Sequence, residues 1–364
     1  MSQPLRLMLT ADPELPVPPR LYGGIERIIA LLADGLAARG HDVTLVAHRD
    51  SATSGRLVPY TRTDSRATSL FANATTIGAA ALRHRPHVIH SFGRLASLAA
   101  VWPLRRPLVM SYQRVITPRS VVWGKRLGGR RLAFTACSDR MLEGVRHLVP
   151  WRVIHNAVDT ARYRFAPKVA ADAPLVFLGR VEHIKGPHLA IEVARRTGRR
   201  LVIAGNVPEE HRTFFDEQVR PHVDGDRIRY VGPVDDAAKS ALLSTSSALL
   251  MPILWEEPFG IVMTESLACG TPVIGMARGA LPEIVANGVT GAACRDTDGL
   301  VQAVVGIDRL DRSACRQSAE ARFSQPVLVD AYEALYRELA AVPLASPRVA
   351  TTAQERSVAA GGDQ

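Results

Sequence analysis

Apolar residues near the start of the chain change from a short continuous run to a helical repeat. The run Leu5–Leu9 has the length of a strand, and a glycine pair at 23–24 follows a proline-rich loop. From there apolar residues recur at every third or fourth position as far as Gly40, namely at Ile25, Ile28, Ile29, Leu32 and Leu36. A second apolar run, Val43–Ala47, comes next. A strand, a glycine turn, a helix and a second strand predict a parallel sheet.

Similar short apolar runs recur along the rest of the chain. In the first half they predict strands at Val88–His90, Leu108–Ser111, Ala133–Ala136 and Arg152–His155. In the second half they predict strands at Leu175–Leu178, Leu201–Ala204, Ile228–Val231, Ala248–Met251 and Val273–Gly275, with helices at Pro187–Arg196, Ala237–Ser244 and Gly260–Ala268. The fold class is therefore α/β, with two doubly wound, Rossmann-like domains that face each other across a central cleft.

The domain boundaries follow from this pattern. We place an N-terminal domain at residues 1–160 and a C-terminal domain at residues 161–325. A helix over 326–340 carries Val329, Tyr332 and Tyr336 on one stripe, and such a helix could cross back to the first domain. The tail 341–364 is poor in aromatic residues and is expected to be disordered. The least patterned stretches, 51–80 and 113–131, are where we expect substrate choice to reside.

The composition is that of an ordinary globular protein, with 47% hydrophobic residues in 364. The first apolar run is too short for a signal peptide, and no run approaches the roughly 20 residues that span a bilayer. The four cysteines lie far apart without a C-x-x-C pair, which indicates neither a disulfide framework nor a zinc site. We therefore expect a cytoplasmic protein with reduced thiols.

The net positive charge of the chain comes from its first half. Residues 1–165 carry 24 Lys and Arg against 10 Asp and Glu, whereas the remainder carries 21 against 25. This excess serves either general solubility or an anionic partner. A basic stretch with interleaved Val121, Val122, Trp123 and Leu127 suggests peripheral contact with an anionic membrane; its cations are Arg114, Arg119, Lys125, Arg126, Arg130 and Arg131. A loop for a phosphorylated acceptor and a solvated face are the alternatives. No nucleic acid partner is expected, because helix-turn-helix and aromatic-rich RNA motifs are lacking.

Two cations follow one predicted strand of the second domain. Arg180 stands at the strand end, and Lys185 returns after a loop of four residues. A diphosphate is the natural partner of such a pair, since arginine offers forked hydrogen bonds and lysine a mobile point charge. A solvated basic pair is the alternative.

The segment Glu256-Glu257-Pro258-Phe259-Gly260 opens a predicted helix. The backbone N–H groups of Gly260 and Ile261 could bind a phosphate or sugar oxygen at the helix start. Glu265 lies about two turns into this apolar helix, where vicinal ribose hydroxyls would supply the donors that a buried carboxylate needs. Alternatively, Glu257 only complements the helix dipole and Glu265 pairs with an arginine.

Gly23 and Gly24 precede the first helix and allow a ligand to approach the backbone closely. The pattern G-G-I-E differs from G-x-G-x-x-G, so a nicotinamide dinucleotide is not favoured. A tight helix entry without a ligand would leave the same pattern.

Taken in chain order, these motifs resemble the family 4 glycosyltransferases of the retaining, GT-B type. The resemblance covers nearly all of residues 5–340. The matching segments are Tyr22-Gly23-Gly24-Ile25-Glu26, Arg39-Gly40-His41-Asp42-Val43, Val153-Ile154-His155-Asn156-Ala157-Val158-Asp159, Gly179-Arg180, Lys185-Gly186, Glu257-Pro258-Phe259-Gly260, Glu265 and Ala268-Cys269-Gly270-Thr271-Pro272-Val273-Ile274.

The resemblance implies a role for each matching residue. Arg180 and Lys185 would hold the diphosphate of a nucleotide-sugar donor and stabilise the leaving group. Glu265 would bind the ribose, and Glu257 would bind the transferred sugar together with the Phe259 and Gly260 backbone. Gly24 would contact the phosphate from the acceptor side. No metal or other cofactor is expected, because the two cations supply the positive charge.

The chain departs from the family at one position. Many relatives carry a histidine after the strand at Leu108–Ser111, where this chain has Gln113, which can donate a hydrogen bond to a sugar but cannot take a proton. His90 and His155 lie near the expected cleft and could serve the acceptor side or be structural. In relatives the turn containing Val234 lies beside the base, and Asp236 would either bind guanine or, with Asp235, cap the next helix.

The sequence thus predicts a retaining glycosyltransferase that moves a sugar from a nucleoside diphosphate sugar to an acceptor hydroxyl. The acceptor would be a lipid-linked sugar, a glycan or a small molecule, in cell-surface polysaccharide, glycolipid or natural-product glycosylation. A GT-B synthase or phosphorylase that uses sugar phosphates is one alternative. A catalytically silent scaffold that binds nucleotide sugars is another, motivated by Gln113.

Overall fold

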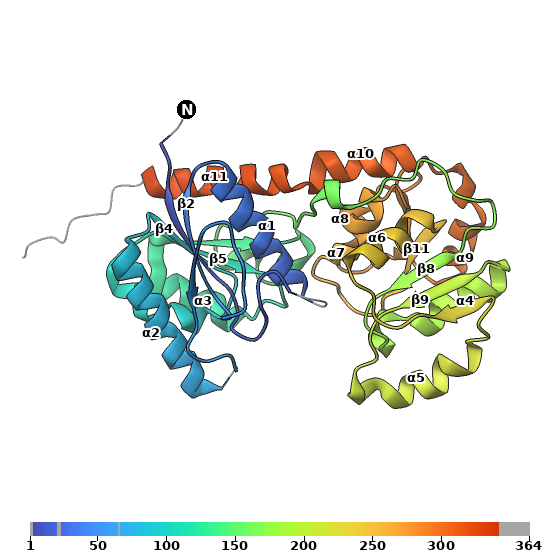
Figure 1. The fold of residues 1–364 in the computed structure, drawn as a ribbon, viewed down its shortest axis with the longest axis horizontal. Coiled ribbons are helices and arrows are strands. Elements are labelled where there is room, and N and C mark those ends of the chain that lie inside the picture. The colour runs from blue at the N-terminus through green and yellow to red at the C-terminus, as the bar shows by residue number, and fades with distance from the viewer. Residues whose placement is uncertain (1–2, 20–22, 65, 342–364) are drawn as a thin grey trace, which may run out of the picture.

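The computed structural model describes residues 3–19, 23–64 and 66–341. Tyr22 and the tail beyond residue 341, which was predicted to be disordered, lie outside these residues. Each half of the chain forms its own parallel sheet, and helices cover both sheets (Figure 1). The expected pair of doubly wound domains is confirmed.

The first sheet has seven strands in the order β3-β2-β1-β4-β5-β6-β7. The strands are β1 (Arg6–Thr10), β2 (Asp42–Ala47), β3 (Arg56–Pro59), β4 (Val88–Ser91), β5 (Leu108–Tyr112), β6 (Leu132–Ala136) and β7 (Trp151–Val153), and the helices are α1 (Gly24–Ala38), α2 (Ala67–His84) and α3 (Pro118–Gly128). The strand order reverses between β1 and β4. In open α/β sheets, ligands bind beyond the carboxyl ends of the strands at such a point.

The second sheet has six strands in the order β10-β9-β8-β11-β12-β13, and its order reverses between β8 and β11. The strands are β8 (Leu175–Leu178), β9 (Leu201–Ala204), β10 (Ile228–Tyr230), β11 (Ala248–Met251), β12 (Val273–Met276) and β13 (Gly291–Cys294). The helices are α4 (Pro187–Thr197), α5 (Arg212–Gln218), α6 (Asp236–Thr245), α7 (Ile261–Ala268), α8 (Leu281–Ile284), α9 (Thr297–Val305), α10 (Arg312–Phe323) and α11 (Gln325–Ala341). No helix in the described ranges is long and apolar enough to cross a lipid bilayer.

Among the elements that the sequence analysis did not predict are two strands and the long helix α2. Both strands, β3 and β13, lie at sheet edges, and their sequences RLVP and GAAC contain few large apolar residues. The helix α2 occupies the weakly patterned stretch 51–80, and it exposes Phe71 and Leu82 on its surface. Exposed apolar residues blur the helical repeat, which explains why the pattern was not recognised.

The last helix crosses back to the first domain, as Figure 1 shows along the upper edge of the molecule. Its apolar stripe is buried in the core that contains α1 and β1, with the side chains of Leu328, Val329, Tyr332, Leu335 and Tyr336. Gly35 of α1 permits this contact, because a Cβ atom there would lie 2.5 Å from Val329 Cγ2. Gln325 Nε2 also donates to the Leu31 carbonyl at 2.8 Å. The first core is therefore completed by a helix from the far end of the chain.

His90 is part of this docking, which corrects its assignment to the acceptor side. The ring is 1% exposed, and its two nitrogens contact the Tyr336 hydroxyl at 2.5 Å and Ser111 Oγ at 2.6 Å. Burial lowers the pKa of His90 to about 3, so the ring is neutral at physiological pH. His90 therefore holds α11 in place, because its ring is buried in the core and contacts Tyr336 of that helix.

Replacing Tyr336 by Phe tests this contact. The variant should lose about 1–3 kcal/mol of unfolding free energy in a urea titration, because His90 Nδ1 would remain buried without its partner. Tyr332→Phe is the matched control and should cost less, since its partner Ser111 Oγ keeps its contacts with His90 and Thr135. Equal losses for the two variants would contradict the role assigned to the Tyr336 hydroxyl.

Candidate active site

The predicted site residues of the second domain gather where its strand order reverses. Arg180 follows β8 and Glu257 follows β11, and these two strands are hydrogen-bonded neighbours. Lys185 Nζ contacts Glu257 Oε2 at 2.5 Å and lies 4.6 Å from the centre of the Trp255 ring. The two loops are thus joined by an ion pair. A cation and a carboxylate that are 72 residues apart share one place in the fold.

Arg180 has a carboxylate partner in its own loop. Its Nη2 atom lies 2.8 Å from Glu182 Oε1, and the other oxygen of Glu182 lies 3.1 Å from His211 Nε2. Glu182 is 3% exposed, so this contact fixes the guanidinium from the buried side. The sequence analysis did not single out Glu182, although its position between Arg180 and Lys185 could have indicated it.

Glu265 lies on α7 and is 4% exposed. Its Oε1 atom accepts hydrogen bonds from the Tyr163 hydroxyl at 2.7 Å and from Lys239 Nζ at 2.5 Å. The contacts of this buried carboxylate therefore come from a tyrosine and a lysine rather than from the arginine considered above. The sequence analysis did not predict these two partners, because Tyr163 lies in the segment after the first domain and Lys239 lies on α6, both distant from Glu265 in the sequence.

The starts of α1 and α7 approach each other across the two domains. A Cβ atom on Gly24 would lie 3.1 Å from Ile261 Cδ1. Gly23, with φ of 149°, and Gly260, with φ of 74°, occupy backbone regions that other residues rarely adopt. Because the two helix starts are close together, the positive ends of both helix dipoles lie in the same region. An anion placed there would meet N–H groups from both domains.

Phe259 points away from this region. Its side chain is 3% exposed and packs near the rings of His155 and Phe323, with centroid distances of 5.9 and 6.1 Å. Only the backbone of Phe259 can therefore contact a ligand. The His155 ring packs beside Phe259 and Phe323.

The turn that contains Val234 leads into α6. Asp235 caps this helix, since its side chain accepts from the Ala238 N–H at 2.8 Å. Asp236 Oδ2 instead contacts Arg27 Nη1 of the first domain at 2.6 Å, and Oδ1 lies 3.2 Å from Lys239 Nζ. Burial raises the pKa of Asp236, but the hydrogen bond from Arg27 and the charge of Lys239 lower it by more. The pKa of Asp236 is therefore below its usual value. The Asp236 carboxylate therefore joins the two domains in this structure.

Gln113, at the position where relatives have a histidine, is held by a second amide. Its Oε1 atom accepts from Asn156 Nδ2 at 2.8 Å, and Asn156 is 4% exposed. Anchoring the carbonyl end leaves the Gln113 NH₂ group as the end that can donate to a ligand. Asn156 belongs to one of the matching segments, but its contact with Gln113 was not predicted.

Two family models match consecutive parts of the chain. Residues 22–162 match the model described as Glycosyltransferase Family 4, and residues 161–309 match the model described as Glycosyl transferases group 1. The chain belongs to the family 4 glycosyltransferases. It is therefore an enzyme that transfers a sugar, as the motifs predicted.

Known proteins similar to this glycosyltransferase span most of its length. A glycogen synthase of Mycobacterium tuberculosis is 28% identical and covers 84% of this chain and 87% of its own. AviGT4, a glycosyltransferase involved in avilamycin A biosynthesis, has a structure that is 26% identical, with a TM-score of 0.72 over 93% of this chain and 99% of that one. HepE of Anabaena, solved with UDP and glucose, shares the fold at 16% identity, with a TM-score of 0.73 over 92% and 100% of the two chains.

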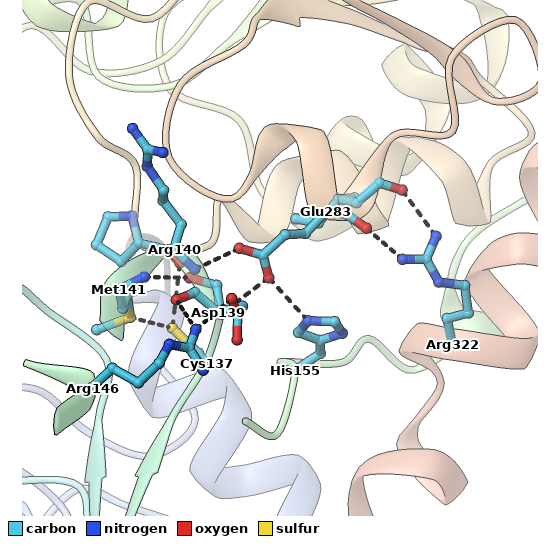
Figure 2. A network of polar contacts seen from close by, with 11 residues as sticks. Cys137, Asp139, Arg140, Met141, Arg146, His155, Glu283 and Arg322 are labelled. Carbon is cyan, nitrogen blue, oxygen red and sulfur yellow. Dashed lines mark hydrogen bonds and ion pairs between the residues drawn. The ribbon is translucent and has the colours of Figure 1, made fainter. Parts of the chain in front are cut away.

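A polar network that the sequence analysis missed holds the two domains of the glycosyltransferase together (Figure 2). Glu283 of α8 accepts hydrogen bonds from the backbone N–H groups of Asp139 and Arg140 at 2.8 and 2.7 Å. His155 Nε2 lies 3.4 Å from the same carboxylate, and Arg322 of α10 donates to the backbone carbonyl of Glu283. One carboxylate thus connects the loop after β6, the segment between the domains and the second domain.

Glu283 should make the stability of the glycosyltransferase depend on pH. Burial raises the pKa of Glu283, but the hydrogen bonds from His155 and from the two N–H groups lower it by more. The pKa of Glu283 is therefore below its usual value of 4.5. Because the folded protein favours the charged form, the stabilisation is complete above the unfolded-state value and is lost as pH falls through the folded one.

We expect Glu283→Gln to lower the unfolding free energy by about 1–3 kcal/mol at pH 7, since a hydrogen bond to a charged group stabilises the fold more than one between neutral groups. The difference from the wild type should shrink as pH falls below about 4.5. Denaturant titrations at several pH values measure both effects. Glu143→Gln is the control, because that carboxylate is exposed and its pair with Arg140 should contribute less than about 1 kcal/mol. A difference that does not depend on pH would contradict the assignment.

Proposed function

We propose that this glycosyltransferase moves a sugar from a nucleoside diphosphate sugar to an acceptor hydroxyl and retains the anomeric configuration. The observation that carries the proposal is the joining of the β8 and β11 loops by Lys185 and Glu257 beside the starts of α1 and α7. Cations and two helix starts there favour a diphosphate. UDP bound to HepE, which shares the fold, supports this class of donor.

In this proposal each side chain has one role. Arg180 and Lys185 bind the donor diphosphate, and Gly23, Gly24 and Ile261 contribute backbone surface from the two helix starts. Glu265 accepts from the ribose hydroxyls. Glu257, the backbone at Phe259 and Gly260, and the amide of Gln113 hold the transferred sugar.

The reaction exchanges one bond to the anomeric carbon for another. The bond from this carbon to the diphosphate oxygen breaks, and a bond to the acceptor oxygen forms on the same face of the sugar. The acceptor proton passes to the leaving diphosphate oxygen, so no side chain has to take it. Because Arg180 and Lys185 act where negative charge develops, we propose that transfer needs no metal ion.

In this proposal the turn at Val234 and Asp236 contacts the base of the nucleotide. A guanine would have to share Asp236 with Arg27 and Lys239, because these two cations already contact its two carboxylate oxygens. A uracil or adenine would need only backbone groups of the turn. The ion pair therefore favours a donor that leaves Asp236 with Arg27.

A thermal-shift series with UDP, GDP and ADP tests the donor site. A ligand that binds only the folded protein stabilises it by about 2.7 kcal/mol at 100 times its Kd, so the matching nucleotide should raise the midpoint by several degrees. Arg180→Ala and Glu265→Ala should abolish this shift. Arg195→Ala, which changes an exposed arginine of the same domain, should keep it. A wild type that responds to none of the three, or variants that respond fully, would overturn the proposal.

We further propose that α3 contacts an anionic membrane surface from the cytoplasmic side. Three apolar side chains of this helix are exposed, Val122, Trp123 and Leu127, by 39, 57 and 50%. Arg119 and Arg126 are exposed on the same helix, and Arg130 is exposed in the turn that follows it; the Arg126 guanidinium lies 5.9 Å from the centre of the Trp123 ring. Apolar side chains among cations on one helix are typical of a segment that lies on anionic lipid.

The other three cations of this stretch have partners within the protein. Arg114 pairs with Asp12 at 2.9 Å, Lys125 donates to the Leu148 carbonyl at 2.9 Å and Arg131 donates to the Trp102 carbonyl at 3.4 Å. The membrane proposal therefore rests on Arg119, Arg126 and Arg130 together with the exposed apolar side chains.

Sedimentation with vesicles, with and without phosphatidylglycerol, tests the membrane contact. Each surface cation contributes about 1 kcal/mol to binding of anionic lipid, so replacing the three arginines by Gln should weaken binding at least about tenfold. Trp123→Ser should weaken it as well. Val305→Ser, which removes an exposed valine from α9 of the other domain, is the control. Unchanged sedimentation of the triple variant, or equal binding to neutral vesicles, would overturn the proposal.

A further inference from the structure

Lys239 lies inside the candidate donor site, although no sequence motif pointed to it. Its side chain is 11% exposed, and its ammonium lies 2.5 Å from Glu265 Oε1 and 3.2 Å from Asp236 Oδ1. The ammonium is also 5.7 Å from the centre of the Tyr163 ring. Lysine is seldom buried to this extent unless it is paired. These three contacts hold the position of the charge.

The contacts of Glu265 are concentrated on one of its two oxygens. Lys239 and Tyr163 both donate to Oε1, from α6 and from the segment after the first domain. Two donors on the same oxygen fix the plane of the carboxylate. Vicinal hydroxyls of a ribose would therefore meet the other oxygen, Oε2, in a defined orientation.

Removing the lysine would change both charge and geometry. Glu265 would stay buried with the neutral Tyr163 as its remaining donor, and a buried charge without its counter-ion is costly. The carboxylate would then turn toward other donors or toward water. Tyr163 alone contributes a neutral hydrogen bond, which is weaker than a bond from a charged donor.

The same lysine connects the donor site to the other domain. Asp236, the second partner of Lys239, contacts Arg27 of α1 at 2.6 Å, and α1 begins beside Ile261 of α7. Charges therefore alternate in sign from Arg27 through Asp236 and Lys239 to Glu265. The position of Lys239 is set by both domains rather than by α6 alone.

We propose that Lys239 is a positioning residue that makes the donor site specific for ribonucleotides. It holds Glu265 so that Oε2 accepts from the 2′ and 3′ hydroxyls of a ribonucleoside diphosphate. The inference rests on the proposed donor function, in which Glu265 binds the ribose. Lys239 would therefore raise the affinity for ribonucleotides and not for nucleotides that lack these hydroxyls.

Isothermal titration calorimetry tests the inference with the nucleoside diphosphate that stabilises the wild type most and with its 2′,3′-dideoxy analogue. The wild type should prefer the ribonucleotide by roughly tenfold or more, since two hydroxyls bond to a carboxylate. Lys239→Met should reduce this preference to within about threefold and leave the affinity for the analogue nearly unchanged. Lys168→Met makes the same change at an exposed lysine of this domain and should keep the full preference. The thermal midpoint without ligand reports whether each variant is folded.

The other outcomes separate the explanations. A folded Lys239→Met variant with the full preference would overturn the inference and leave Lys239 a structural role. Equal weakening of both ligands would also overturn it, because Lys239 would then attract the diphosphate. A wild type that binds both ligands equally would remove the ribose role of Glu265 from the proposed function. A wild type that binds neither would overturn the donor site itself.

Discussion

The chain passes between the two domains twice, and one backbone bridge holds both crossings together. The Val158 N–H donates to the Phe323 carbonyl at 2.8 Å, and the Gln325 N–H donates to the Val158 carbonyl at 3.1 Å. Because the crossings meet here, α11 can complete the first core while α10 stays with the second domain (Figure 1). The starts of α1 and α7 are then close enough for Gly24 to face Ile261. The proposed donor site depends on this arrangement, since both domains contribute residues to it.

Within the described part of the site, positive and negative side chains occur as pairs. These pairs are Arg180 with Glu182, Lys185 with Glu257, Lys239 with Glu265 and Arg27 with Asp236. Charges this close to the protein interior are tolerated when each has a counter-ion and hydrogen bonds. Arginine and lysine have more donors than one carboxylate oxygen uses, so a diphosphate can share them without breaking every pair. These pairs balance the charges of the proposed donor site, and the donors that the pairs leave unused are the ones that the proposed diphosphate would engage.

The parts of the fold that follow from local pattern were predictable. The predicted strands at Leu175–Leu178 and Leu201–Ala204 coincide with β8 and β9, because central strands of a parallel sheet are continuous apolar runs. The edge strands β3 and β13 are less buried and lack such runs, so the sequence did not predict them. The glycines at 23 and 260 and the cap at Asp235 were found because helix starts use a small set of residues.

The sequence alone determined the fold class, the family and the segments that supply the candidate site, because motifs and periodicity are local properties. The tertiary structure decided the partners of the charged and polar side chains. Tyr163 and Glu265 are 102 residues apart, and Arg27 and Asp236 are 209 residues apart. His90, which could have faced an acceptor, is separated by 246 residues from the tyrosine that it contacts. Such contacts depend on how sheets and helices pack, and no spacing along the chain specifies them. For that reason the contacts of Lys239 and Glu283 follow from the tertiary structure and not from the sequence.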